Sequence, residues 1–104
     1  MANRMSVHQD GKIIYDIVLQ PSFEQLGREV SALGVSGRKL CIVTDSNVAP
    51  LYLEEVRQQL VPWCRAVHTF TFPAGEEHKN LDTVRELYCF LIENQYDRSD
   101  MLVA

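Results

Sequence analysis

Two short polar stretches hold the residue types of this chain that are best suited to chemistry. One is Thr44-Asp45-Ser46-Asn47 and the other is Gly75-Glu76-Glu77-His78-Lys79-Asn80. Each follows an apolar run that is typical of a buried strand, and the second leads into a predicted helix. Backbone N–H groups and the positive end of a helix dipole suit a phosphate at such a place. A carboxylate suits the paired hydroxyls of a ribose, which need acceptors.

Each polar stretch alone also has a simple structural explanation. Asp and Asn after a strand commonly make local turn hydrogen bonds, and an acidic pair before a helix commonly complements the helix dipole. A ligand site requires both stretches to lie at one edge of a sheet, because a pocket needs polar groups that converge.

Other kinds of chemistry have little support in the sequence. The histidines show no metal-binding spacing such as H-E-x-x-H, and we expect His8 and His68 to be solvent-facing or structural. No glycine-rich phosphate loop of the G-x-G-x-x-G or G-K-[ST] type is present. The cysteines form no C-x-x-C pair and have no basic neighbour that would activate a thiolate. We therefore predict free thiols at Cys41, Cys64 and Cys89.

The composition is that of a soluble globular protein. The 104 residues are 46% apolar and 23% charged, which fits one small domain or one piece of a larger one. A net charge of −4 with scattered Lys and Arg argues against nucleic acid as a partner. The first residues form no apolar signal-peptide core, and no apolar run is long enough to span a membrane. We expect a cytoplasmic protein.

The first half of the chain predicts a hairpin, a helix, a strand and a second helix. Asp10-Gly11 is a hairpin-turn signal that would join antiparallel strands over residues 5–8 and 12–19. Ser22 and Gln25 fit a capping box at the start of a helix that ends near Gly34. A buried strand is expected over residues 39–44, and Pro50 suits the first turn of the next helix, which Pro62 ends.

The second half predicts a strand over residues 67–72, a helix capped by Asn80, and an apolar strand over residues 101–104 that we expect to be buried. Strands that alternate with helices imply right-handed crossovers and a parallel sheet. The predicted fold is therefore α/β, a Rossmann-like parallel sheet with flanking helices and an N-terminal β-hairpin. The predicted buried face of the helix consists of Leu81, Val84, Leu87, Tyr88, Leu91, Ile92 and Gln95.

In open parallel sheets, ligands bind at the carboxyl ends of the strands, where both polar stretches are expected. The chain ends inside an apolar strand, and an uncovered central strand would be a pairing hazard. We expect the chain to be an incomplete domain of a longer protein. The alternative is a complete small protein whose last strand lies between its neighbours.

Three stretches resemble the 3-dehydroquinate synthase family in sequence, order and spacing. The two more specific ones are residues 42–52 and 72–80, and the third comprises residues 91–93 and 97–104. The resemblance runs from about Ser6 to Ala104 and includes the hairpin. It implies that residues 1–104 are the N-terminal portion of an NAD-binding, Rossmann-like domain and that a C-terminal metal and substrate domain is absent.

Members of that family convert 3-deoxy-arabino-heptulosonate 7-phosphate to 3-dehydroquinate and phosphate in the shikimate pathway of aromatic amino-acid biosynthesis. They are lyases that use bound NAD and a divalent metal, zinc or cobalt. The alcohol is oxidised, phosphate is eliminated, the ketone is reduced again, and the ring opens and closes by an aldol step. The resemblance also implies a homodimer of the full-length enzyme.

The resemblance assigns cofactor-binding roles to six positions, which are Asp45, Asn47, Glu76, Glu77, His78 and Lys79. Glu76 would accept hydrogen bonds from a ribose, which disfavours the 2′-phosphate of NADP, and Lys79 would place a positive donor near the nucleotide. The glycine-rich pyrophosphate turn, the metal ligands and most basic substrate-binding residues have no counterpart here. No catalytic or metal-binding residue is therefore expected in this chain, which alone should be inactive and bind NAD weakly or not at all.

Three other families remain as alternatives. A related sugar-phosphate cyclase or a polyol dehydrogenase would share the fold, because the residues that separate their substrates lie downstream. A flavodoxin-like signalling module would use Asp45 as a phosphoacceptor, but it would need further acids to bind Mg²⁺ near the preceding strand end, Leu19-Gln20-Pro21.

Overall fold

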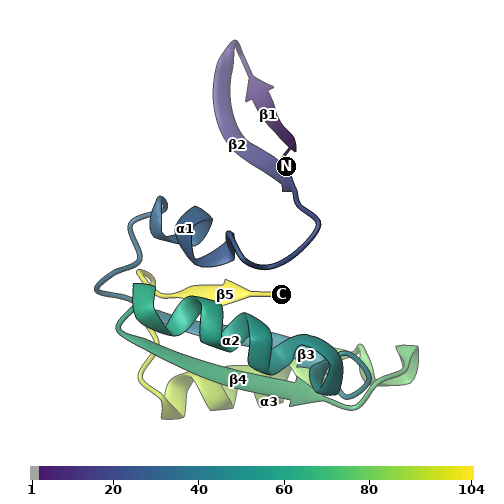
Figure 1. Ribbon diagram of the computed structural model, residues 1–104. Helices are drawn as coiled ribbons and strands as arrows, with labels where there is room; N and C mark the ends of the chain where they lie inside the picture. The colour runs from purple at the N-terminus through teal and green to yellow at the C-terminus, as the bar shows by residue number, and fades with distance from the viewer. Residues whose placement is uncertain (1–2) are drawn as a thin grey trace.

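The computed structural model describes residues 3–104, which form two separate sheets (Figure 1). The first sheet is an antiparallel hairpin of β1 (Asn3–Gln9) and β2 (Lys12–Leu19). Asp10 and Gly11 join the strands with φ angles of 53° and 77°, the left-handed pair that a tight hairpin turn requires. The predicted hairpin is confirmed, and it stands apart from the parallel sheet, with an ion pair between Arg4 and Glu29 that links it to the body of the molecule.

The second sheet contains three parallel strands in the order β4-β3-β5. Its strands are β3 (Lys39–Asp45), β4 (Ala66–Phe72) and β5 (Met101–Val103). The central strand β3 is the best buried of the three, as expected for a strand with neighbours on both sides. The predicted α/β class with a parallel sheet is confirmed.

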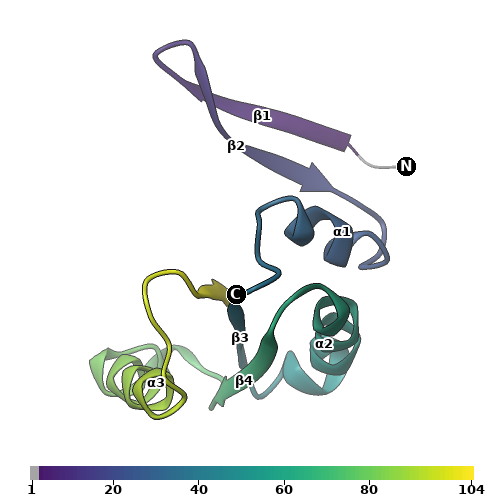
Figure 2. The same cartoon turned by 90° about the vertical axis from the view of Figure 1, so that its left-hand side faces the viewer.

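Helices lie on both sides of the parallel sheet (Figure 2). On one side are α1 (Leu26–Ser31) and α2 (Glu54–Leu60), and on the other is α3 (Leu81–Glu93). A π-helical turn, η1 (Ala49–Leu53), leads into α2, and a 3₁₀ turn, η2 (Val61–Trp63), ends it. Pro50 and Pro62 thus lie where the sequence places them, at the start and end of this helical segment.

The start of α1 differs from the predicted capping box. The helix begins at Leu26, and Gln25 precedes it without a side-chain cap. Ser22 Oγ instead accepts a hydrogen bond from the backbone N of Glu24 at 3.3 Å. A serine hydroxyl can form such a local turn as readily as a helix cap, so the prediction was wrong here. At the other end, Gly34 has the expected left-handed φ of 77°.

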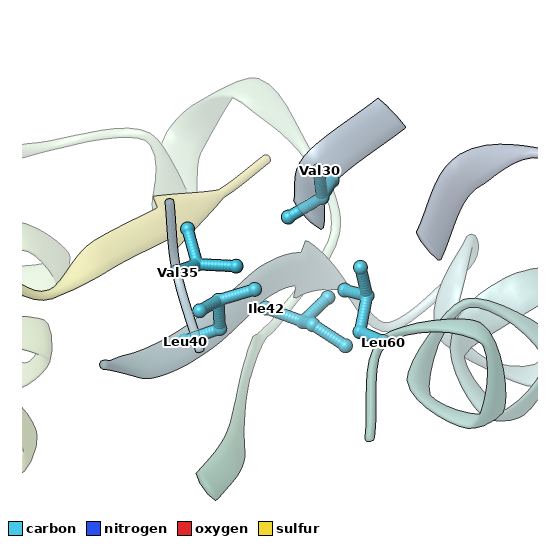
Figure 3. Packing of buried hydrophobic residues seen from close by; sticks show 5 residues of the cluster. All are labelled: Val30, Val35, Leu40, Ile42 and Leu60. Atoms are coloured by element: carbon cyan, nitrogen blue, oxygen red, sulfur yellow. The ribbon is translucent and has the colours of Figure 1, made fainter. Parts of the chain in front are cut away.

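The hydrophobic core lies between the sheet and the α1/α2 side (Figure 3). Alternate residues of β3 point into it, since successive strand side chains face opposite sides of a sheet. At Gly27 of α1, an added Cβ would lie 2.3 Å from the backbone O of Gln59, so only glycine allows this close approach to α2. The buried side chains are Val30, Val35, Leu40, Ile42 and Leu60.

The opposite side of the sheet is less completely covered, which corrects two predictions. The predicted buried face of α3 is largely exposed, with Leu81 at 83%, Tyr88 at 60% and Ile92 at 74% exposure. The helix packs on β4 through neighbouring positions instead, including a contact between the rings of Phe90 and Phe70. Gln95 is also exposed. The helical spacing of these residues predicts one common face of α3. That face stays exposed because no second helix among residues 3–104 covers it.

Strand β5 is the second correction. It was expected to be buried, but it is an edge strand that pairs only with β3. Met101 and Val103 pack against the core, whereas Leu102, on the α3 side, is 51% exposed. The strand is therefore covered on one face only.

Candidate functional site

The two polar loops predicted from the sequence lie side by side at the carboxyl edge of the parallel sheet. Asp45 is the last residue of β3 and lies opposite Phe72, the last residue of β4. The backbone N of Ser46 donates to the backbone O of Phe72 at 2.9 Å, which extends the ladder by one bond. Ser46 Oγ also accepts a hydrogen bond from the backbone N of Ala74 at 2.9 Å. This serine therefore ties the two loops together.

The carboxylate of Asp45 organises the first loop. Its Oδ1 accepts hydrogen bonds from the backbone N of Asn47 at 2.9 Å and of Val48 at 2.8 Å. Its Oδ2 accepts none from residues 3–104. The side chain is half-buried, whereas Asn47 is exposed. One carboxylate oxygen therefore shapes the turn, and the other keeps its capacity to accept hydrogen bonds from a ligand.

The second loop contains a short 3₁₀ turn, η3 (Glu76–His78), entered through Gly75. Gly75 has φ 116° and ψ 145°, a conformation that residues with a Cβ hardly ever adopt. Lys79 Nζ lies 3.3 Å from Glu76 Oε1, and both side chains are exposed. A surface ion pair of this kind contributes about 1 kcal/mol or less, so either partner can exchange it for a ligand. His78 Nε2 and Glu77 Oε1 are 3.9 Å apart.

Asn80 fixes the second loop to the start of α3, as predicted. Its Oδ1 accepts a hydrogen bond from the backbone N of Thr83 at 3.0 Å, and its Nδ2 donates to the backbone O of Glu77 at 2.7 Å. The hydroxyl of Thr83 donates to the backbone O of His78. The orientation of this loop is therefore set by the first turn of the helix.

A cavity of about 520 Å³ opens between the second loop, β3, β4 and α3. Of the six predicted cofactor-binding residues, His78 and Lys79 line it, whereas Asp45, Asn47, Glu76 and Glu77 do not. Its walls are apolar, and His78, Lys79, Asn80 and Thr83 provide its polar rim. This size and lining are typical of small-molecule sites. The apolar lining comes from Val43, Phe70, Phe72, Leu81, Val84 and Leu87.

Sequence reasoning missed the linking serine and the apolar lining of the cavity. Ser46 stands between two predicted ligand residues, and its position directly after a strand was the available signal. Phe70 and Phe72 alternate along β4 and thus share one face. That alternation is visible in the sequence, but the sequence does not show that α3 packs over this face of β4 and encloses the cavity.

The remaining reactive side chains have structural surroundings. Among residues 3–104 no group of three or more His, Cys, Asp or Glu side chains is arranged to hold a metal ion. The thiols are free, and burial raises the pKa of Cys41 to about 11 and also raises the pKa of Cys64. His68 Nδ1 lies 2.8 Å from the hydroxyl of Tyr96, whose pKa is raised chiefly by burial. Within the described part of the chain, no helix is both long and apolar enough to cross a membrane.

Searches with protein-family models found no match. Individual proteins do match. A 3-dehydroquinate synthase of Streptococcus suis (strain 05ZYH33) is 42% identical over 91 residues, which is 86% of this chain. The chain is homologous to part of the 3-dehydroquinate synthases. The synthases of Acetivibrio thermocellus and Pelobacter propionicus are 36% and 38% identical over 86% and 90% of the chain.

The 3-dehydroquinate synthase homology has a defined extent. The chain spans about a quarter of the length of the curated relatives it matches. A crystal structure of 2-deoxy-scyllo-inosose synthase is similar to it with a TM-score of 0.62 and 26% identity, over 66% of this chain and 19% of that one. A second structure of such a synthase, in complex with carbaglucose-6-phosphate, NAD⁺ and Co²⁺, matches with a TM-score of 0.67 and 24% identity, over 78% of this chain and 22% of that one. These structures share the α/β fold of the chain.

Proposed function

We propose that this chain is the N-terminal portion of the NAD-binding domain of a 3-dehydroquinate synthase. The complete enzyme would eliminate phosphate from 3-deoxy-arabino-heptulosonate 7-phosphate and close the ring of 3-dehydroquinate, in the shikimate pathway of the cytoplasm. The observation that carries this proposal is the 36–42% identity to synthases over most of the chain. The sugar-phosphate substrate, the homodimer and the divalent metal, zinc or cobalt, all belong to the complete enzyme in this proposal.

The role of this chain in that enzyme is to hold part of the NAD. The free Oδ2 of Asp45 and the exposed carboxylate of Glu76 fit the hydroxyls of a ribose, which need acceptors. Lys79 releases Glu76 and places its positive charge near the nucleotide. A 2′-phosphate beside Glu76 would meet like charge, so NAD is preferred over NADP. When bound, NAD supplies the reversible removal of a hydride, and the residues of this chain position it.

An NMR titration of the ¹⁵N-labelled chain tests this role, because it detects weak binding. We expect millimolar NAD to shift the amides of Asp45, Asn47, Glu76 and Lys79, with smaller shifts for NADP. Glu76→Gln should weaken the NAD shifts, whereas Glu93→Gln, near the far end of α3, is the matched control. Amides at Asp45, Glu76 and Lys79 that stay unshifted by NAD would contradict the proposed role.

Catalysis is tested in a hybrid in which this chain replaces the matching quarter of the Streptococcus suis synthase. We expect the hybrid to release phosphate from 3-deoxy-arabino-heptulosonate 7-phosphate and the isolated chain to release none. A related sugar-phosphate cyclase is the second candidate, favoured by the similarity to 2-deoxy-scyllo-inosose synthase. Because the residues that separate these substrates lie downstream of this chain, the full-length protein decides between the two candidates. Its turnover of glucose 6-phosphate in place of the heptulosonate substrate would support the related cyclase.

A further inference from the structure

The α3 side of the parallel sheet carries exposed apolar side chains on α3 and on β5, which residues 3–104 leave uncovered. Leu81, Val84, Tyr88 and Ile92 follow one another at intervals of three, four and four residues and so form one stripe along α3. All four are exposed, from 38% at Val84 to 83% at Leu81. Leu102 of β5 is also exposed, and it lies on this side of the sheet. It is the register partner of Cys41, which faces away from the core because its neighbour Leu40 faces into it.

The topology of the sheet defines which element fits this surface. The crossover from β4 through α3 to β5 passes over β3 and places its helix on the α3 side. Crossovers between parallel strands are right-handed in nearly all proteins. A further crossover in the same direction, from β5 to a strand beyond it, must therefore place its helix on the α3 side as well. That helix would lie over Leu102 and beside the stripe on α3.

The outer edge of β5 fits the same element. This strand pairs with β3 through Met101, Leu102 and Val103, and no strand among residues 3–104 lies on its other side. Its free backbone N–H and C=O groups can pair with a parallel strand. A helix followed by a strand therefore satisfies both the apolar stripe and the open edge, which neither element does alone.

We propose that the stripe of α3 and the edge of β5 together form the docking surface for an amphipathic helix and a parallel strand from the remaining part of a 3-dehydroquinate synthase. The inference rests on the proposed function, because it takes the occupant from that enzyme. The length of the relatives supports it, since this chain spans about a quarter of them. Arg85, one turn from Leu81 and exposed, lies at the rim of the stripe and fits an acidic residue of the docking helix.

Cysteine labelling tests this surface in the isolated chain and in the hybrid with the Streptococcus suis synthase. A cysteine at Ile92→Cys should react rapidly with a maleimide in the isolated chain and at least about tenfold more slowly in the hybrid, because burial restricts access. Leu33→Cys, on the opposite side of the sheet and 62% exposed, is the matched control and should react equally in both. Both variants carry Cys89→Ser, so that the exposed native thiol does not contribute.

Three results would overturn the proposal. The first is equal labelling of Ile92→Cys in the chain and the hybrid. The second is protection of Leu33→Cys in the hybrid without protection of Ile92→Cys. The third is a dimer of the isolated chain that Ile92→Lys abolishes, which would make a second copy the occupant. If the hybrid does not fold, cysteines at the aligned positions of the intact Streptococcus suis synthase answer the same question.

The proposed function can fail separately from the docking surface. Protection of Ile92→Cys does not require NAD, and the NAD-induced shifts at Asp45 and Glu76 do not require the rest of the enzyme. Protection without nucleotide shifts would keep the docking surface and contradict the NAD site. Nucleotide shifts without protection would do the reverse.

Discussion

The two faces of the parallel sheet share their strands but differ in how they are covered. Leu40 and Ile42 of β3 face α1 and α2 and are almost completely buried. Cys41, between them, faces the α3 side and is buried too, but its neighbour Leu102 is half exposed. The first face is completely covered, whereas the second is covered only in part, by the packing of α3 on β4. The contrast shows that an apolar pattern identifies a face that needs covering without identifying what covers it.

The largest expected difference between the faces comes from a matched pair of leucines. Leu40→Ala removes a fully buried side chain and should lower the free energy of unfolding by roughly 2–5 kcal/mol. Leu102→Ala, on the neighbouring strand but half exposed, should cost about 1 kcal/mol or less. Urea unfolding followed by circular dichroism measures both, and equal losses would show that the faces are equally well packed.

The close approach of α1 to α2 should be sensitive to a single methyl group. Gly27→Ala would place its Cβ 2.3 Å from the backbone O of Gln59 and should destabilise the chain by roughly 1–3 kcal/mol. Gly37→Ala is the control, because an added Cβ there meets no atom within 4 Å. Thermal unfolding of both variants checks this. An unchanged unfolding temperature of Gly27→Ala would mean that α1 can move away from α2 without loss of stability.

On the other face, the start of α3 depends on one side-chain cap. Asn80→Ala removes the acceptor for the backbone N of Thr83 and should cost about 1 kcal/mol. Asn80→Asp keeps that acceptor and should recover most of the loss. Amide exchange at Thr83 reports on the cap directly, and unchanged exchange in Asn80→Ala would exclude it.

The smallest expected effect is a difference in reactivity between the native thiols, which leaves the fold unchanged. At pH 8 a thiol reagent should modify exposed Cys89 and spare Cys41, whose pKa burial raises to about 11. Because this pKa is raised, the thiol stabilises the native state below the unfolded value near pH 8.5, and that contribution is lost as the pH rises through about 11. Mass spectrometry after brief labelling identifies the site, and early modification of Cys41 would show that the α3 face opens.

Much of the fold could be predicted from local signals. Asp10-Gly11 determines the hairpin, the apolar run of β3 indicates a central strand, and Asn80 marks the start of α3. Ser22 was misleading because its hydroxyl satisfies a turn as well as a helix cap. The exposure of Tyr88 could not be predicted, because periodicity reports how apolar a helix face is and burial depends on distant partners.

For the candidate site, the sequence predicted which loops would meet but not how they are joined. Parallel strands end at one edge, so the loops after β3 and β4 had to be neighbours. The bond from Ala74 to Ser46 Oγ depends on a side-chain rotamer and a loop path that no spacing rule contains. The sequence likewise does not show that Asp45 Oδ1 accepts the hydrogen bonds of the turn while Oδ2 accepts none from residues 3–104, because this depends on the three-dimensional path of the loop.

The separate hairpin has a mechanical consequence. Asn3 is paired with Leu19, so the strand that carries the N-terminal end and the strand that leads into the body meet at the same end of the hairpin. A tensile force applied between the two ends of the chain would therefore break the hydrogen bonds between β1 and β2 one after another, starting at the pair of Asn3 and Leu19. The parallel strands β3 and β5 run in the same direction, so a pull along β5 must shear all of their bonds together. Under load the hairpin should open first and leave the parallel sheet intact.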